Sequence, residues 1–352
     1  SFEHFEFRDA PGKGIGAFAT KAISAGTILS FEKPLFLVRE SDNDGKESDI
    51  EDAYSRLSAT DKQRFQALRD PDWEAHKHKY SWIVSKFSAN TFQTGSNGMA
   101  GCYAIGSRFN HSCLPNTVCS GSEDGQYFKT LVDIEQDEEL TFCYMTHLLF
   151  MTTEERRPVL RQRLSQDCKC DLCCRPPSER IVSDMRRFLL RRVHYKLQGH
   201  DVEDAYPEIK GMRDHEYGNW AQATLYALLM ASLAEAEGTV AGQTQQFMFT
   251  MAAKFLVVQY YTKGFQRIPQ VACDNIRTWQ QKAHRIHKLD PYTGHIQGDI
   301  DWAQTQRLMD SVGDTGDLPP LSRFKDYIPP APPKRRPCGF EALFGALFSH
   351  VG

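Results

Sequence analysis

The sequence has no apolar run long enough to cross a membrane. A transmembrane helix needs about 20 consecutive apolar residues, and the strongest candidate, 247–261, is interrupted by Lys254. No signal-peptide pattern opens the chain; its first residue is Ser rather than Met, which is compatible with removal of upstream sequence. We therefore expect a soluble intracellular protein, in the cytoplasm, the nucleus or both.

The sequence also has no marked excess of positive or negative charge. The chain has 42 Lys and Arg against 45 Asp and Glu, a formal charge of -3. Nucleic-acid-binding proteins usually show a marked basic excess, and the basic run at 334–336 is too short to supply one. We expect no direct sequence-specific binding of nucleic acid.

The regular cysteine pairs of a disulfide scaffold are absent as well. The ten cysteines are unevenly spaced, and four of them fall within 168–174. Such clustering in a chain of this length is typical of a metal site in a reducing compartment. Cys168, Cys170 and Cys173 offer three thiolates from one tight loop, which suits tetrahedral Zn²⁺.

A tetrahedral site needs a fourth ligand. Cys174 directly follows Cys173, so it is not the obvious choice. Cys113 is the better candidate, because it would clamp the thiol cluster onto the Asn-His pair at 110–111. Four thiolates would leave no open position, so the expected role of the zinc is structural. The alternative of unrelated small apolar residues is disfavoured by the tight grouping.

The chain divides into a β-rich part and a helical part. Strand patterns cover 2–38 and 99–144, and helix-compatible spacing covers 51–92. Beyond the two prolines at 176–177 the strand signals stop. Helices are then expected at 184–197, 219–237, 244–262, 271–288 and 301–311.

The C-terminal stretch has a different character. Residues 313–338 are rich in Pro, Gly and charge, as in an extended linker. Apolar residues then recur at helical spacing over 340–351, which predicts a short amphipathic helix. Such a helix could dock on the protein body, bind a partner or lie on a membrane surface. Docking is favoured, because the helix has few cations to hold it to lipid.

Three further polar candidates are weak when taken singly. Asn110 and His111 beside a proline loop are often turn and cap residues. Tyr144 at the end of an apolar strand is more often a core tyrosine. The glycine-rich turn at 11–16 lacks the spacing of a phosphate-binding loop, although its glycines allow a ligand to approach the backbone closely.

In combination, these motifs resemble a SET-domain methyltransferase. The pattern is Gly-x-Gly at 14–16, Asn-His-Ser-Cys at 110–113, Glu-Glu-Leu-Thr-Phe-x-Tyr at 138–144 and the cysteines at 168–173. Within that family the chain is most similar to the SMYD branch and its fungal relatives, over about 5–175. The implied fold is α+β. A SET β-fold with a pseudoknot spans 1–150 and contains a helical insertion at 41–98. A post-SET zinc loop follows at 151–177, then a helical C-terminal domain at 178–312 and a linker with the terminal helix at 313–352.

The resemblance implies transfer of a methyl group from S-adenosylmethionine to a lysine of a histone or non-histone protein. We expect the chain to be a monomer. Tyr144 would be the catalytic residue, and Cys113, Cys168, Cys170 and Cys173 would bind Zn²⁺. The implied cofactor contacts are Lys13, Gly14, Ile15, Asn90, Asn110, His111 and Tyr144. Two alternatives stay open: a SET-fold enzyme acting on a small molecule, and a non-catalytic binding module. Retention of Tyr144 and the Asn-His pair argues against the second.

Two features depart from the SMYD pattern. The insertion at 41–98 has no cysteine, so the MYND zinc finger and its partner binding are not expected. Leu164, four residues before Cys168, stands where SMYD-type enzymes usually place an aromatic residue of the lysine channel. The substrate and the degree of methylation therefore stay open.

Overall fold

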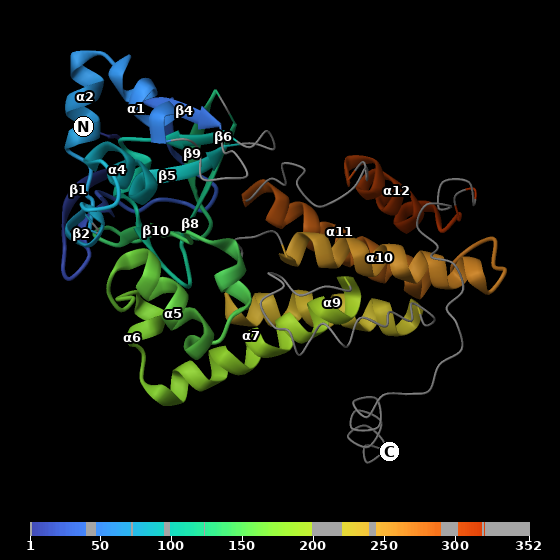
Figure 1. The fold of residues 1–352 in the computed structure, drawn as a ribbon. Coiled ribbons are helices and arrows are strands. Elements are labelled where there is room, and N and C mark those ends of the chain that lie inside the picture. Colours follow the sequence, from blue (N-terminus) through green and yellow to red (C-terminus); the bar gives the residue numbers. More distant parts are fainter. Residues whose placement is uncertain are drawn as a thin grey trace.

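The computed structural model describes residues 2–39, 47–71, 73–94, 99–122, 124–198, 220–238, 244–289, 302–318 and 320. The amphipathic helix expected at 340–351 lies outside these residues, as does most of the linker expected before it. Figure 1 shows the strands gathered in one part of the molecule and the long helices of the C-terminal region in another.

Within the described residues, ten strands form three small sheets with the orders β1-β2-β10-β7, β3-β9-β8 and β4-β6-β5. The strands are β1 (Phe5–Ala10), β2 (Gly14–Ala19), β3 (Ile28–Glu32), β4 (Phe36–Arg39), β5 (Thr91–Thr94), β6 (Met99–Cys102), β7 (Asn110–His111), β8 (Thr117–Ser122), β9 (Gly125–Thr130) and β10 (Glu139–Phe142). Neighbouring strands are antiparallel except for β7 and β10, which pair in parallel. This exception places two distant motifs side by side.

Stacked aromatic rings fix the position of β7. Phe109, directly before this strand, is fully buried, and its ring lies 4.1 Å from that of Phe128 on β9. Phe5 of β1 packs edge-on against Phe109, with the ring centroids 5.3 Å apart. Aromatic contacts of this kind add to the burial of apolar area. The residue before the Asn-His pair is thereby anchored in the core of the sheets.

The expected helical insertion is present, with one correction. Its helices are α1 (Glu47–Ser55), α2 (Ala59–Gln66), α3 (Trp73–His76) and α4 (Trp82–Asn90). Helical spacing predicted a helix through residue 92, but the chain leaves the helix after Asn90 and forms β5, which pairs with β6. The β-branched and aromatic residues at 91–92 favour a strand once a partner strand is available.

The segment before the cysteines is the helix α5 (Thr153–Leu164), and a capping box marks its start. Thr152 and Glu155 form a complete capping box, in which each side chain bonds the backbone N–H of the other residue. At the C-terminal end, Ser165 adopts a left-handed conformation with φ 57°. The chain therefore turns sharply into the cysteine loop and the short helix α6 (Asp171–Cys174).

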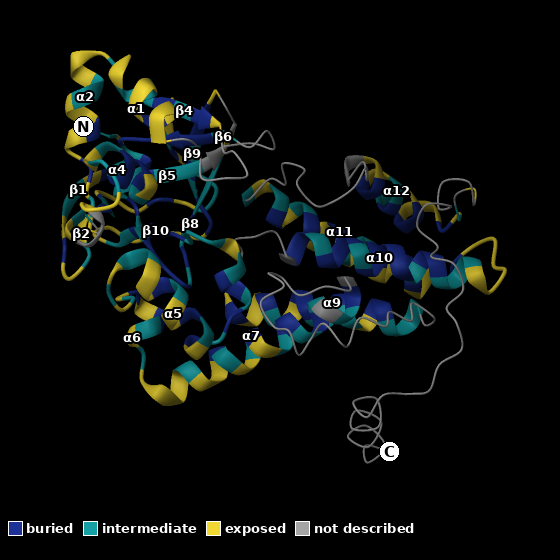
Figure 2. Ribbon diagram, in the orientation of Figure 1, coloured by how far each residue is buried: buried dark blue, intermediate teal, exposed yellow. Residues whose placement is uncertain are grey.

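The C-terminal region is helical, as the sequence predicted. Its described helices are α7 (Pro177–Gln198), α9 (Trp220–Glu237), α10 (Thr244–Thr262), α11 (Gln270–Leu289) and α12 (Trp302–Thr315). Small side chains such as Ala227, Ala231 and Ala252 are fully buried, which lets α9 and α10 pack closely. Buried residues cover much of both helices in Figure 2, whereas the start of α7 is largely exposed. Helix α12 continues to Thr315, past the expected start of the linker at 313.

None of the helices in the described part of the chain combines the length and the apolar character that crossing a membrane requires.

Candidate active site

The parallel pairing of β7 with β10 builds the centre of the site. Asn110 lies opposite Thr141, and His111 lies opposite Phe142. Beyond the strands, Ser112 N donates to the carbonyl of Phe142 at 3.0 Å. Tyr144 follows β10 by two residues, so its backbone comes beside His111. Two motifs that are separate in sequence therefore form one surface.

All seven residues proposed to contact a cofactor line one cavity. Its volume is about 280 Å³, and these residues are Lys13, Gly14, Ile15, Asn90, Asn110, His111 and Tyr144. The sequence placed them on four separate segments, and the turn after β1, helix α4, strand β7 and the end of β10 bring them together. Leu164 and Cys168 line the same cavity. The unusual residue 164 therefore lies next to the proposed cofactor contacts.

A carboxylate that sequence reasoning missed connects two of these residues. Glu139 Oε2 pairs with Lys13 Nζ, and Glu139 Oε1 accepts a 2.8 Å hydrogen bond from Asn110 Nδ2. Asn110 Nδ2 also donates to the carbonyl of Ile15 at 3.2 Å. Glu139 starts β10 and pairs with β2, so its side chain reaches both. Its place in the Glu-Glu-Leu motif was the only sequence signal.

Asn90 is tied to the wall of the cavity. Its amide Nδ2 donates to the carbonyl of Arg69 at 2.7 Å and to that of Lys86 at 2.8 Å. Arg69 in turn donates from Nη1 to the carbonyl of Lys13 at 2.8 Å. Asn90 was expected to contact the cofactor. Its amide nitrogen holds the 67–71 segment through the carbonyl of Arg69, and neither of these two hydrogen bonds uses its amide oxygen. Arg69 was not expected to belong to the site.

Tyr144 lines both the first cavity and a second, larger one. The second cavity measures about 660 Å³ and shares five lining residues with the first: Ala89, Asn90, Ser107, Tyr144 and Arg163. The Tyr144 hydroxyl donates to the carbonyl of Phe109 at 3.0 Å. Burial raises the pKa of Tyr144 to about 12, so the hydroxyl stays protonated and its oxygen can accept a hydrogen bond from a ligand.

The ring of His111 has a neighbour at each of its two nitrogens. Its imidazole is 4% exposed, and Nδ1 accepts a hydrogen bond from Tyr144 N at 3.2 Å. Nε2 lies 3.3 Å from Cys113 Sγ. Burial lowers the pKa of His111 to about 4, so the ring is neutral and carries its proton on Nε2. Both ring nitrogens of His111 therefore face protein atoms, and His111 also lines the first cavity.

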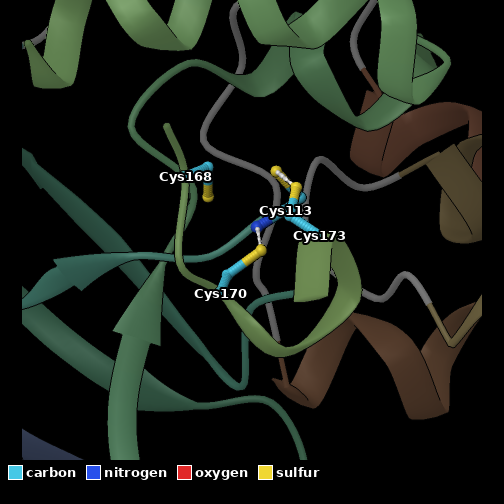
Figure 3. A group of neighbouring side chains, drawn as sticks. All are labelled: Cys113, Cys168, Cys170 and Cys173. Carbon is cyan, nitrogen blue, oxygen red and sulfur yellow. Dashed lines mark hydrogen bonds between the residues drawn. The ribbon is translucent and has the colours of Figure 1, made fainter. Parts of the chain in front are cut away.

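The four cysteines proposed as metal ligands converge (Figure 3). The sulfur atoms of Cys113, Cys168, Cys170 and Cys173 all lie within 4.8 Å of one another, and those of Cys113 and Cys173 are 3.6 Å apart. Zn–S bonds of ~2.3 Å in a tetrahedron separate the sulfurs by about 3.8 Å. The donor set therefore fits Zn²⁺.

The surroundings of the cluster favour a thiolate at Cys170. Hydrogen bonds from Cys113, Cys168 and Cys173 hold the pKa of the Cys170 thiol well below its usual range. Cys113 N donates to Cys170 Sγ at 3.5 Å, as expected for a sulfur that carries negative charge. Cys174, the alternative fourth ligand, is exposed and is not part of the cluster.

Comparison with known proteins identifies the domain that carries this site. Residues 14–145 match the family model described as SET domain. Over 180 residues, the chain is 29% identical to the histone-lysine N-methyltransferase set5 of Schizosaccharomyces pombe, which covers 50% of this chain and 53% of that protein. A putative SET domain-containing protein of Acanthamoeba polyphaga mimivirus is 28% identical over 192 residues, covering 46% of this chain and 74% of that protein.

A third relative is similar over a shorter stretch. The histone-lysine N-methyltransferase SMYD3 of Homo sapiens is 44% identical over 75 residues, covering 21% of this chain and 17% of that protein. Residues 14–145 of this chain therefore match the SET domain, and the chain is similar to SET-domain proteins. Its relatives include SMYD proteins, which confirms the resemblance seen in the sequence. It spans about half the length of the set5 relative.

Proposed function

We propose that this chain transfers a methyl group from S-adenosylmethionine to the amino group of a lysine side chain. The observation that carries the proposal is that Tyr144 lines both cavities. The smaller cavity, lined by the Asn-His pair and the glycine-rich turn, would hold the cofactor. The larger cavity would admit the substrate, and the methyl group would pass between them at Tyr144.

The residues of the smaller cavity suit a ligand with an amino-acid end. S-adenosylmethionine, when bound, supplies an activated methyl group on a sulfonium. The Lys13 ammonium could bind its carboxylate, and Glu139, which pairs with Lys13 and Asn110, could bind its amine. Gly14 has a φ of 85°, a conformation that glycine adopts without strain, and it brings the backbone close to the cavity.

Tyr144 would act by orientation rather than by proton transfer. A lysine ammonium, with an ordinary pKa of ~10.4, must lose a proton before it can attack. Removal from water lowers that pKa, because burial disfavours the charged form. The Tyr144 oxygen, fixed by its bond to Phe109 O, would then hold the neutral amine in line. Such alignment alone can lower a barrier by several kcal/mol.

We further propose that Zn²⁺ binds the four clustered cysteines in a structural role. Three ligands come from the segment at 168–173, and Cys113 belongs to the same loop as the Asn-His pair. The ion would therefore fasten the C-terminal part of the site to the cofactor-binding part. With four sulfur ligands it would have no free position for a substrate.

A second candidate function is methylation of a small polar molecule. The larger cavity, at about 660 Å³, is wider than a single lysine side chain requires. Two buried polar atoms on its wall, Tyr103 Oη and Gln126 Nε2, have no hydrogen-bond partner within the described structure. Buried polar groups are rarely left unpaired, so these atoms could bind a polar substituent that a lysine side chain lacks.

The experiment that separates these functions follows the methyl group. The protein is incubated with methyl-labelled S-adenosylmethionine and a cell extract that has been divided into macromolecules and small molecules. Protein-lysine methylation predicts label in the macromolecular fraction, on lysine after digestion. Label in the small-molecule fraction would favour the second function. If neither fraction gained label over a Tyr144→Phe control, the proposed methyl transfer would be wrong.

A further inference from the structure

A buried arginine joins the helical C-terminal region to the cysteine loop. Arg187 belongs to α7, and its side chain is 0% exposed. Its Nη2 donates to the carbonyl of Cys113 at 2.8 Å. Its Nη1 donates to the carbonyls of Leu148 and Leu149, at 3.2 and 3.3 Å. These two carbonyls belong to η2 (Thr146–Phe150), the turn that follows Tyr144.

The same guanidinium is paired with a carboxylate from another helix. Arg187 Nε donates to Glu237 Oε1 at 2.8 Å, and the Glu237 side chain, at the end of α9, is only 2% exposed. Glu237 also accepts a hydrogen bond from the Ser183 hydroxyl. Charges this deeply buried are tolerated only when they are paired and hydrogen-bonded. Arg187 is therefore held from the helical side in one orientation.

The contacts continue from Arg187 to Tyr144, the proposed catalytic residue. Cys113, whose carbonyl Arg187 binds, has its sulfur 3.3 Å from His111 Nε2. His111 Nδ1 accepts the hydrogen bond from Tyr144 N at 3.2 Å. From Glu237 to His111, every residue in this series is buried. A continuous series of buried polar contacts thus leads from α9 to Tyr144.

We propose that Arg187 is a positioning residue through which the helical region sets the geometry of the metal loop and of Tyr144. Arg187 binds the carbonyl of Cys113, in the loop before Tyr144, and two carbonyls of η2, the turn after Tyr144. It thereby holds this loop and this turn in a fixed position relative to each other. For Tyr144 the inference rests on the proposed function, whereas for the cysteine cluster it does not.

The shape of the side chain explains why arginine is needed. A guanidinium presents five N–H donors in a rigid plane and can bond several acceptors at once. A lysine at this position could still pair with Glu237, but its single ammonium could not reach the Cys113 and η2 carbonyls in the same arrangement. Charge and positioning can therefore be separated experimentally.

The test compares two double variants of the full chain. Arg187→Met with Glu237→Leu removes both buried charges and leaves neither unpaired; such replacements often preserve folding. Asp274→Asn with Arg277→Gln removes an exposed ion pair of α11 and serves as the matched control. Thermal unfolding, zinc release to a colorimetric chelator and calorimetric binding of S-adenosylmethionine are measured for each.

The proposal predicts that the first double variant unfolds cooperatively yet releases zinc about tenfold faster, as loss of a partner outside the ligand shell usually does. It also predicts weaker cofactor binding, and wild-type values for the control. Arg187→Lys should show an intermediate release rate, and it keeps the test decisive if the double variant fails to fold. Wild-type zinc release and cofactor affinity in folded variants would overturn the proposal. A wild-type chain that binds no cofactor would instead contradict the proposed function, while zinc release would still decide the role of Arg187.

Discussion

The backbone N–H of Tyr144 donates a hydrogen bond to Nδ1 of His111, although 33 positions separate the two residues. Parallel pairing of β7 with β10 brings them together, and neutral His111 can accept this bond because burial lowers its pKa to about 4. The other ring nitrogen lies against Cys113 Sγ. One imidazole therefore connects the proposed catalytic residue with the proposed metal site.

Replacement of Tyr144 by Phe tests the catalytic role. The variant loses the oxygen that would orient the amine, so we expect the methyl-transfer rate to fall by about 100-fold or more, as on removal of one fixed polar group. Cofactor affinity should stay within about twofold, since the ring remains. Tyr127→Phe on β9, outside both cavities, is the control. Normal turnover by Tyr144→Phe would show that the hydroxyl is not needed.

Replacement of Gly16 by Ala tests the polar cluster at the cofactor cavity. A Cβ at this position would lie 2.7 Å from Glu139 Oε1 and 2.9 Å from Asn110 Nδ2, so both side chains must move. We expect cofactor affinity to drop by about tenfold or more, since small displacements of binding groups are costly.

The matched control for that change is Gly264→Ala. Gly264 has a φ of 78°, and a Cβ added there would meet no atom within 4 Å. Alanine therefore adds backbone strain of about 1 kcal/mol without touching the site. It should lower the midpoint of thermal unfolding slightly and leave calorimetric cofactor binding unchanged. Equal binding by both variants and the wild type would refute the role given to Glu139 and Asn110.

Single cysteine replacements test the ligand set. Cys170→Ser removes one of the four converging sulfurs, and we expect the zinc content measured by elemental analysis to fall from about one ion per chain towards zero. Cys174→Ser changes the exposed neighbour outside the cluster and should keep the full content. Zinc retained in the first variant and lost in the second would assign the fourth ligand to Cys174 instead.

The pH dependence of turnover tests the protonation state of Tyr144. Because burial raises its pKa to about 12, the hydroxyl keeps its proton throughout the accessible range. The rate should therefore rise with pH as the substrate amine loses its proton, with no decline between about pH 8 and pH 10. A decline in that range, matched by tyrosinate absorbance that Tyr144→Phe lacks, would contradict this assignment.

Local patterns allowed much of the fold to be predicted. The capping box at Thr152 and the helices of the C-terminal region follow from neighbouring residues, because helical spacing and caps act within a few positions. The helix predicted through residue 92 was wrong at 91–92, because pairing with β6 determines the conformation of these two residues. No pattern within α4 reveals that partner strand.

The site shows the same division. Three of the clustered cysteines lie within one short segment, so their convergence was foreseeable from spacing alone. Glu139 and Arg187 were missed because their partners are remote: Lys13 lies 126 positions from Glu139, and Cys113 lies 74 from Arg187. The orientation of the His111 ring was likewise open, since strand pairing and burial determine it.

We propose that the cysteine loop at 168–173 and the cofactor cavity form one site, which Cys113 and His111 connect. Calorimetric titration of the zinc-loaded, chelator-stripped and zinc-reconstituted protein with S-adenosylmethionine tests it most directly. The structure predicts that stripping weakens binding by about tenfold or more and that added zinc restores it. Equal affinity of the stripped and loaded proteins would contradict the claim.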